Sequence, residues 1–233
     1  MPDHFVETNI IIGYTVEWDR QAPVVKSYLD SLSGIDLHTS PRVLSEAENV
    51  VNERRRLAKQ AARHIFQDFE TGHRRPGIDE IVDFVWKKLS DCRDAAVDHV
   101  IQHIEDNEYY YTGLTQVDSR NGLQSTSDDI DDDFDAAVNI IVNIRNQNCD
   151  GFEPEIFTNI NQNYNNYSVF STIDRILSGK PTDRDILLDS YHLTQKESLS
   201  LLYFVTMDGD FLDNDSDIES CLGTVDVEHP NSV

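Results

Sequence analysis

The chain has 233 residues, of which 39% are hydrophobic, so it is long and apolar enough to fold around a core. It carries 43 Asp and Glu against 19 Lys and Arg, giving a formal net charge of −24. Such a charge opposes the binding of nucleic acids unless salt or a local basic patch offsets the field. Only six of the cationic residues are Lys. This balance is typical of proteins that work in very high salt, so we expect a halophilic source.

Cysteine usage and hydropathy indicate a cytoplasmic protein. The cysteines Cys92, Cys149 and Cys221 are odd in number and lack the paired spacing of a zinc site, so neither a disulfide framework nor zinc is indicated. No run approaches the roughly 18 apolar residues of a membrane span, and the N-terminus lacks a basic segment followed by an apolar one. We therefore expect a protein of the reducing cytosol with no membrane partner.

The first apolar stretch, residues 4–13, is interrupted by the polar triplet Glu7-Thr8-Asn9. If Phe5 and Val6 end a short central strand, Glu7 lies at its carboxyl end, and a packed helix begins near Ile10. The alternative is an edge strand whose polar residues face water. The first interpretation predicts a carboxylate at the edge of a sheet.

A second strand is predicted at residues 34–38, which alternate briefly between apolar and polar side chains. Ser40 and Pro41 then supply an N-cap and a first-turn proline for a helix that should run to about residue 70. Glu46 falls in the first two turns of this helix, near the end of the preceding strand. It could equally be a solvated helix residue.

The densest cationic run of the chain lies farther along the same predicted helix. It is the obvious candidate for phosphate contacts, and Arg74 and Arg75 follow it after a turn at Gly72. A charged face that keeps a long helix in solution is the alternative explanation. The candidate RNA-binding residues are Arg54, Arg55, Arg56, Lys59 and Arg63.

The middle of the chain reads as helical and acidic. Residues 78–104 carry apolar side chains at helical spacing and predict one long amphipathic helix. We interpret roughly 106–150 as an insertion. Within it, the acidic run 127–133 is expected at the entrance of a helix, because acidic side chains complement the positive end of a helix dipole.

Two further helices are predicted before the last strands. Residues 159–167, rich in Asn and Tyr, read as a polar loop, and 168–177 as a short helix closed by a glycine. Another helix begins at Pro181. Asp185 lies in its first turn and points toward the strand ends if the helix runs antiparallel to the sheet.

The C-terminal part contains two predicted strands. The apolar run 203–206 reads as a short buried strand that is followed at once by Asp208 and Asp210, and 224–228 alternate as an edge strand does. Strands separated by helical crossovers imply a parallel sheet covered on both faces. Ligands bind beyond the carboxyl ends of such strands, where an acidic pair suggests a cation site.

Four segments, taken together, resemble the four motifs of the PIN domain family in order and separation: Glu7-Thr8-Asn9, Ser40 to Glu46, Asp185 to Leu188, and Val205 to Phe211. The resemblance implies a three-layer α/β/α fold with a central parallel sheet. It also implies a single PIN-like domain over 1–233, with 72–165 as an enlarged helical and acidic insertion.

The resemblance further implies a ribonuclease that depends on Mg²⁺ or Mn²⁺, cations that prefer oxygen ligands. Its catalytic carboxylates would be Glu7, Glu46, Asp185 and Asp208. Its metal ligands would be Glu7, Asp185, Asp208 and, as a lesser ligand, Asp210, with Glu46 as ligand or organiser. Asn9 and Thr206 would position the backbone around them.

RNA is the partner that the resemblance implies, and an antitoxin protein and self-association occur among relatives. Glu7 stands where the family usually has Asp, and the extra methylene shifts its oxygens by about 1.5 Å. One alternative is therefore a catalytically impaired module that binds RNA or protein. Another is that the acidic set is only a halophilic surface, in which case these carboxylates should point in different directions.

Overall fold

A computed structural model of the chain describes residues 2–69, 76–92, 94–115, 120–148, 152–158, 160 and 163–233. The chain forms two compact units. The sheet unit comprises Met1–Thr15, Gln21–Ala47 and Ile140–Val233, and the helical unit comprises Val16–Arg20 and Glu48–Asn139. The helical unit therefore begins and ends earlier in the chain than the 72–165 insertion expected from sequence.

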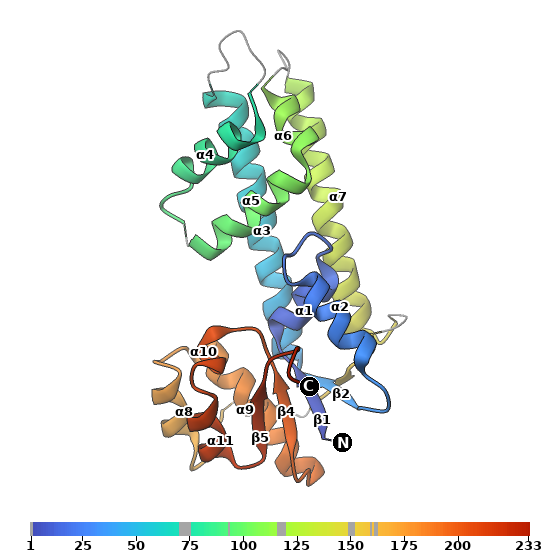
Figure 1. Cartoon of the computed structure of the whole chain (residues 1–233), viewed down its shortest axis with the longest axis vertical. Coiled ribbons are helices and arrows are strands. Elements are labelled where there is room, and N and C mark those ends of the chain that lie inside the picture. The colour runs from blue at the N-terminus through green and yellow to red at the C-terminus, as the bar shows by residue number, and fades with distance from the viewer. Residues whose placement is uncertain are drawn as a thin grey trace. The chain divides into compact units, whose positions relative to one another are not determined.

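The sheet unit is built on five parallel strands in the order β3-β2-β1-β4-β5 (Figure 1). The strands are β1 (Asp3–Val6), β2 (Leu37–Thr39), β3 (Glu155–Ile156), β4 (Leu202–Val205) and β5 (Val225–Glu228). Because β2 lies on one side of β1 and β4 on the other, the order of the sheet reverses at β1. This is the topological switch point, where open parallel sheets bind ligands.

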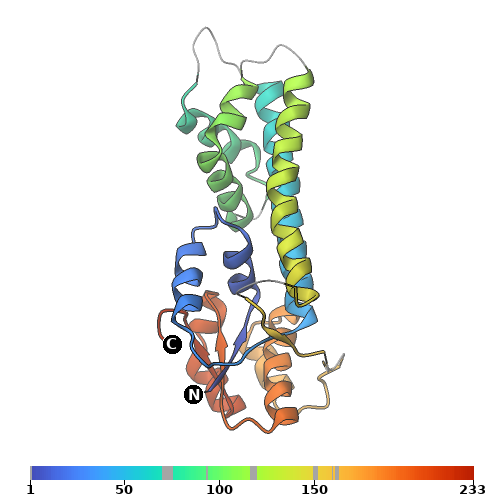
Figure 2. The same ribbon diagram turned by 90° about the vertical axis from the view of Figure 1, so that its right-hand side faces the viewer.

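Helices flank this sheet (Figure 2), which confirms the predicted α/β class with a central parallel sheet. They are α1 (Thr8–Thr15), α2 (Ala22–Ser31), α8 (Phe170–Ile176), α9 (Pro181–Glu197), α10 (Gly209–Leu212) and α11 (Asp215–Leu222). The first turns of α3 (Pro41–Asp68) and the end of α7 (Arg120–Arg145) also belong to the sheet unit. Helix α9 packs against β4 and β5.

The two central strands end level with each other. Phe5 pairs with Phe204 and Val6 with Val205, and all four side chains are fully buried. Burial on both faces explains why β4 and the end of β1 are apolar without alternation. The Glu7 N–H donates to the Val205 carbonyl (3.3 Å), which carries the ladder one residue farther. The residues that follow β1 and β4 therefore emerge at the same edge of the sheet.

The helical unit contains α3 from residue 48, α4 (Ile78–Lys88), α5 (Asp94–Asp106), α6 (Glu108–Leu114) and α7 up to residue 139. The prediction of one helix over 78–104 was wrong, because α4 ends at Lys88 and α5 begins at Asp94. Lys87 and Lys88 occupy the last turn of α4, where cations complement the negative end of the helix dipole. The apolar residues of α4 and α5 both recur at helical spacing, which had suggested one continuous helix.

The acidic run 127–133 lies inside α7, so its predicted place at a helix entrance was also wrong. The helix already begins at Arg120. Within the run, Asp131 accepts a hydrogen bond from Lys59 Nζ (2.6 Å), and Asp133 lies 3.2 Å from His103 Nε2. Side chains on other helices therefore contact part of the acidic run. Its negative charges do not depend on the positive end of a helix dipole.

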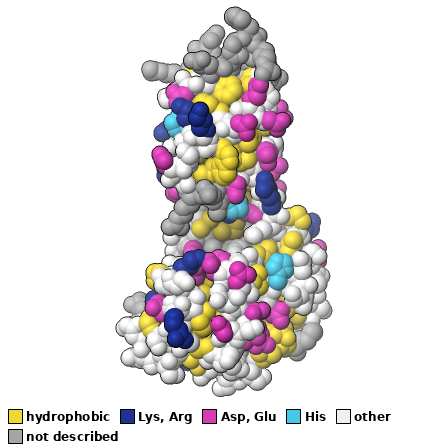
Figure 3. Space-filling model, turned by 60° about the vertical axis from the view of Figure 1, so that its left-hand side comes forward, with side chains coloured by type: hydrophobic (Ala, Val, Ile, Leu, Met, Phe, Trp, Pro, Cys, Tyr) yellow, Lys and Arg dark blue, Asp and Glu magenta, His cyan; other side chains and the backbone are white. Residues whose placement is uncertain are grey.

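On the face drawn in Figure 3, Asp and Glu side chains are spread over the surface with Lys and Arg side chains among them. Cys92 and Cys221 are free thiols, and Cys149 lies outside the described residues. Among the described helices, none combines the length and apolar character that a membrane span requires.

Candidate metal centre

Glu7 lies directly beyond the central strand β1 and is 5% exposed. Its Oε2 atom accepts hydrogen bonds from the Asn9 backbone N–H (3.1 Å) and from the Thr206 hydroxyl (3.2 Å). Both contacts are to one oxygen, so Oε1 is left for another partner. Glu7 stands between the buried strand β1 and helix α1, which begins at Thr8. These two elements fix its backbone and so hold its carboxyl group in place.

The segment after β4 supplies two more carboxylates to the same edge. Thr206 is fully buried, and its hydroxyl oxygen accepts a hydrogen bond from the Asp208 N–H (3.0 Å) while donating to Glu7. Asp208 then caps α10, because its Oδ1 accepts from the Asp210 N–H (2.7 Å). Thr206 thus links the residues after β1 to those after β4.

Glu46 reaches this edge from the second turn of α3. Its Oε2 accepts a hydrogen bond of 2.6 Å from the hydroxyl of Thr8, the neighbour of Glu7. It is not a freely solvated helix residue, since burial raises the pKa of its carboxyl and the nearby charges of Asp183 and Asp208 add to the rise. Of the two interpretations of Glu46 from sequence, the structure supports the one near the strand ends.

The third aspartate of the site is Asp183, in the first turn of α9. Asp183, Asp208 and Asp210 each offer a carboxylate oxygen, and these three oxygens lie within 4.8 Å of one another. Three oxygen donors at such separations suit a hard divalent cation such as Mg²⁺ or Mn²⁺, which completes its shell with water. The acidic group can therefore hold a metal ion, and its donor chemistry fits the predicted cofactor.

Four carboxyl groups of this site, those of Glu7, Glu46, Asp183 and Asp208, have raised pKa values. Burial, with smaller contributions from the charges of Glu46 and Asp208, raises the pKa of Glu7 to about 8. Burial also raises the pKa of Asp183 and of Asp208, and the charge of Asp208 adds to the rise at Asp183. Carboxylates brought together away from water destabilise one another, and such groups are concentrated at functional sites.

These contacts contradict the interpretation of the acidic set as scattered surface charge. Five carboxylates from four segments interact at one edge of the sheet: Glu7, Glu46, Asp183, Asp208 and Asp210. Four of the five were expected from sequence. Asp185, which the sequence analysis placed in the set, lies elsewhere.

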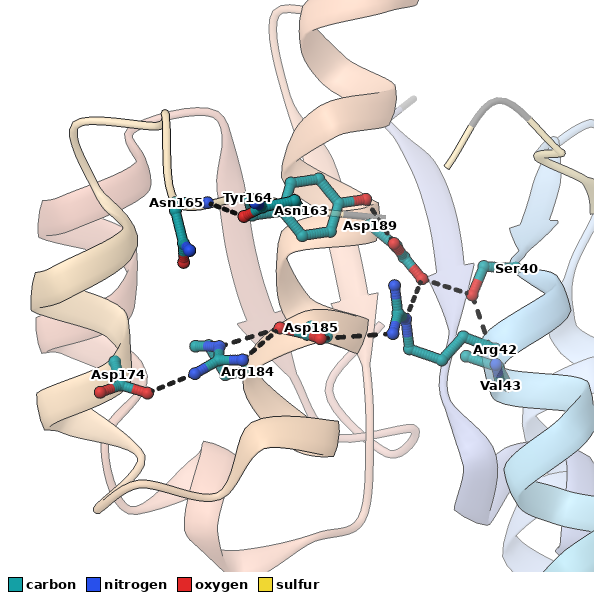
Figure 4. A network of polar contacts seen from close by, with 10 residues as sticks. All are labelled: Ser40, Arg42, Val43, Asn163, Tyr164, Asn165, Asp174, Arg184, Asp185 and Asp189. Atoms are coloured by element: carbon teal, nitrogen blue, oxygen red, sulfur yellow. Dashed lines mark hydrogen bonds and ion pairs between the residues drawn. The ribbon is translucent and has the colours of Figure 1, made fainter. Parts of the chain in front are cut away.

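Asp185 belongs to an ion-pair network with Arg42 and Arg184 (Figure 4). Its carboxylate accepts hydrogen bonds from Arg184 Nε (2.8 Å) and from Arg42 Nη1 (3.3 Å). Arg184 continues the network to Asp174, with an Nη1 to Oδ1 distance of 2.6 Å. Two arginines thus surround Asp185, whereas Asp183 contacts other carboxylates.

The reason for this division is the geometry of the helix. Residues two apart on an α-helix are separated by about 200° around its axis, so Asp183 and Asp185 leave α9 on nearly opposite sides. Periodicity therefore indicates that only one of them can reach the strand ends. Which one does so depends on the rotation of α9 about its axis, which its packing on β4 and β5 decides.

The interior end of this network is the fully buried Asp189. Its Oδ2 accepts from the Ser40 hydroxyl (2.8 Å) and from Arg42 Nε (3.3 Å), and its Oδ1 accepts from the Tyr164 hydroxyl (Figure 4). Ser40 also accepts from the Val43 N–H (3.3 Å), as an N-cap does. The network fixes the start of α3, and hence Glu46 one turn beyond Arg42, against α9.

The cationic run proposed for RNA is largely engaged with carboxylates of the helical unit. Arg54 is buried and contacts Asp19 (2.8 Å). The next three cations pair as follows: Arg55 with Asp135 (2.5 Å), Arg56 with Glu53 (2.7 Å) and Lys59 with Asp131 (2.6 Å). Arg63 is exposed, and Arg74 and Arg75 lie outside the described residues. These pairs favour the alternative of a charge-balanced helix face, with Arg54 as a buried exception.

Comparisons of the chain with models of known protein families, with curated proteins and with solved structures found no significant match.

Proposed function

We propose that the chain is a PIN-like, metal-dependent endoribonuclease that uses Mg²⁺ or Mn²⁺ to cleave RNA phosphodiester bonds. The observation that carries this proposal is the convergence of five carboxylates beyond β1 and β4, at the switch point of a parallel sheet. Three of the four segments that resemble the family supply carboxylates to this site, namely Glu7, Glu46 and Asp208. The metal is the part that the donor set supports most directly.

In this proposal Asp183, Asp208 and Asp210 hold the cation, and Glu7 and Glu46 line the other side of the site. The bound ion would lower the pKa of a water molecule and neutralise charge that builds on the phosphate. Glu7 is suited to hold or release a proton near neutral pH, because its pKa is about 8. Since Oε2 accepts two hydrogen bonds, Oε1 is the atom that carries this proton.

RNA as the substrate follows from the family resemblance and from the phosphodiester chemistry of such a site. The paired cations Arg54, Arg55, Arg56 and Lys59 give it little support, because their charges are balanced within the helical unit. Exposed Arg63 is the member of the run best placed to contact a phosphate. An antitoxin partner, self-association and a cytoplasmic location stay predictions.

A second candidate is a module that binds RNA or protein without cleaving it. Two observations favour it: the longer Glu7 side chain in place of the family's usual Asp, and the contact of the Lys180 ammonium with Asp210. An ammonium group at a carboxylate partly replaces a metal ion. The two candidates differ in whether the chain turns over RNA.

The test is cleavage of structured and single-stranded RNA by purified protein with Mn²⁺ in concentrated KCl. We expect cleavage by the native chain and at least a roughly 100-fold lower rate for Asp208→Asn, because the substitution removes a ligand charge. Asp217→Asn, an exposed position on α11, is the matched control and should cleave normally. Unchanged cleavage by Asp208→Asn would contradict this site, and Mn²⁺ binding without cleavage would favour the binding module.

A further inference from the structure

Lys180 stands at the rim of the carboxylate site. It immediately precedes α9, and its ammonium group contacts the carboxylate of Asp210. The side chains of Lys180 and Asp210 are 49% and 47% exposed, so both can move into solvent. The positive charge of Lys180 also lowers the pKa of Asp183 and of Asp208, against the effect of burial.

Lys180 is a positive charge beside a site that consists of carboxylates. Five carboxylates interact there, and within the described part of the chain Lys180 is the only Lys or Arg that forms an ion pair with any of them. Arg42 lies one turn before Glu46, and it pairs with Asp185 and Asp189. Arg184 follows Asp183 directly, and it pairs with Asp174 and Asp185. Without Lys180, the described residues would supply no Lys or Arg in an ion pair with these carboxylates.

We propose that Lys180 is a built-in counter-ion of the metal-free site, which a divalent cation displaces from Asp210. The inference rests on the metal site of the proposed function and adds how that site is regulated. Lys180 holds Asp210 near Asp183 and Asp208 before the ion arrives. It then competes with the ion for Asp210, and so sets the metal concentration at which the site fills.

The energetics allow this exchange. An ion pair between half-exposed side chains is weak, so its loss is easily offset by a divalent ion on three carboxylates. The backbone need not move. Ser178 and Gly179 have left-handed φ values of 51° and 72°, and the following Pro181 keeps Lys180 extended (φ −82°, ψ 95°). Only the flexible four-carbon stem of Lys180 has to swing away.

The released ammonium would remain within reach of the site, because the backbone of Lys180 is held at the start of α9. A cation at that position can donate to a phosphate oxygen of the substrate. Lys180 would then have two successive partners, Asp210 in the metal-free protein and a phosphate in the loaded one. The same side chain would both limit metal binding and favour a polyanion at a site of otherwise negative charge.

The test is Mn²⁺ binding by titration calorimetry, in the KCl concentration that keeps the chain folded. Lys180→Met should bind Mn²⁺ about fivefold more tightly than the native chain, because the competing cation is gone. Lys196→Met, an exposed position in the last turn of α9, is the matched control and should bind as the native chain does. Lys180→Arg keeps the charge and should retain most of the competition.

A coupling experiment separates competition for Asp210 from a general field effect. In an Asp210→Asn background the partner of Lys180 is absent, so Lys180→Met should change the Mn²⁺ dissociation constant by less than about twofold. Circular dichroism spectra confirm that each variant is folded. An equally large effect of Lys180→Met in both backgrounds would contradict the displacement of Lys180 from Asp210.

The outcomes distinguish this inference from the proposed function. Equal Mn²⁺ affinity in the native chain and Lys180→Met overturns the counter-ion and leaves the nuclease proposal intact. Absence of Mn²⁺ binding in both proteins overturns the metal site together with the inference. Tighter binding by Lys180→Met, with no RNA cleavage by the native chain, supports the counter-ion and overturns the nuclease.

Discussion

The carboxylate site of the sheet unit and the charged face of α3 in the helical unit use acidic residues in opposite ways. In the helical unit, Asp19, Asp131 and Asp135 each contact an arginine or lysine of α3. In the sheet unit, the carboxylates around Glu7 and Asp208 face one another instead, and their pKa values are raised. Paired acids stabilise a fold, whereas converging acids destabilise it until a ligand arrives. In a chain this acidic, the arrangement of the charges therefore identifies the candidate site better than their number.

The two tryptophans allow the units to be followed separately. Trp18 and Trp86 both belong to the helical unit, and Trp18 packs against the rings of His103 and Phe134. Tryptophan fluorescence therefore reports on the helical unit, while Mn²⁺ binding reports on the sheet unit.

The largest effect is expected from Arg54→Met in the helical unit. The change leaves the fully buried Asp19 carboxylate without its arginine, which typically costs about 3 to 5 kcal/mol of folding free energy. His99 lies 3.6 Å from Asp19, and burial and Arg54 lower its pKa to about 4. Without Arg54, this histidine can gain a proton at low pH and partly replace the lost charge, so the measurement belongs at pH 8.

Urea unfolding followed by tryptophan fluorescence measures the effect of Arg54→Met. Arg56→Met removes a cation from an exposed pair with Glu53 on the same helix, and should cost less than about 1 kcal/mol. Mn²⁺ affinity should be the same in both variants if they are measured while folded. Equal losses in the two variants would show that Arg54 is no more than a surface charge.

The second effect is expected from Asp183→Asn, which should weaken Mn²⁺ binding by about 100-fold, because it removes one of three converging oxygen ligands. Asp185→Asn is the matched change two residues away. It loses partners in the arginine network and should lower the melting temperature, with Mn²⁺ affinity within about threefold of the native chain. A larger loss of affinity in Asp185→Asn would restore the assignment made from the sequence motif.

A smaller effect is expected in the pH dependence of the metal-free protein. The pKa of Glu7 is raised from 4.5 to about 8, so the folded state holds a proton that the unfolded chain releases. Its contribution to stability is complete below pH 4.5 and is lost as the pH rises to about 8. We expect the free energy of unfolding to fall by on the order of 2 kcal/mol over this range. This is less than the full difference between the two pKa values would give.

Glu7→Gln cannot ionise and should not show this loss. Relative to the native chain, its melting temperature in EDTA, followed by circular dichroism, should rise steadily between pH 5 and pH 8. Glu197→Gln, at the exposed end of α9, should follow the native profile. Parallel profiles for the native chain and Glu7→Gln would mean that Glu7 is ionised in the folded protein.

Local patterns were sufficient to predict the central strands and four of the five converging carboxylates. Glu7 and Asp208 follow short apolar runs, and the carboxyl ends of parallel strands meet at one edge, so strand order and burial place these residues together. The edge strand β3 was not predicted, because two residues, Glu155 and Ile156, carry no strand pattern of their own. Its existence depends on pairing with β2.

Charge and spacing, by contrast, did not predict which side chains meet, because this depends on the rotation of each helix and on the helices packed against it. The sequence places Asp183 and Asp185 in one helix start, and the packing of α9 selects Asp183 for the site. The cations of α3 resembled a phosphate-binding run, and α7 supplies the aspartates that balance Arg55 and Lys59. Composition and periodicity act along the chain and determine its strands and its net charge. Which charges meet depends on contacts between distant segments, and only the tertiary structure decides those.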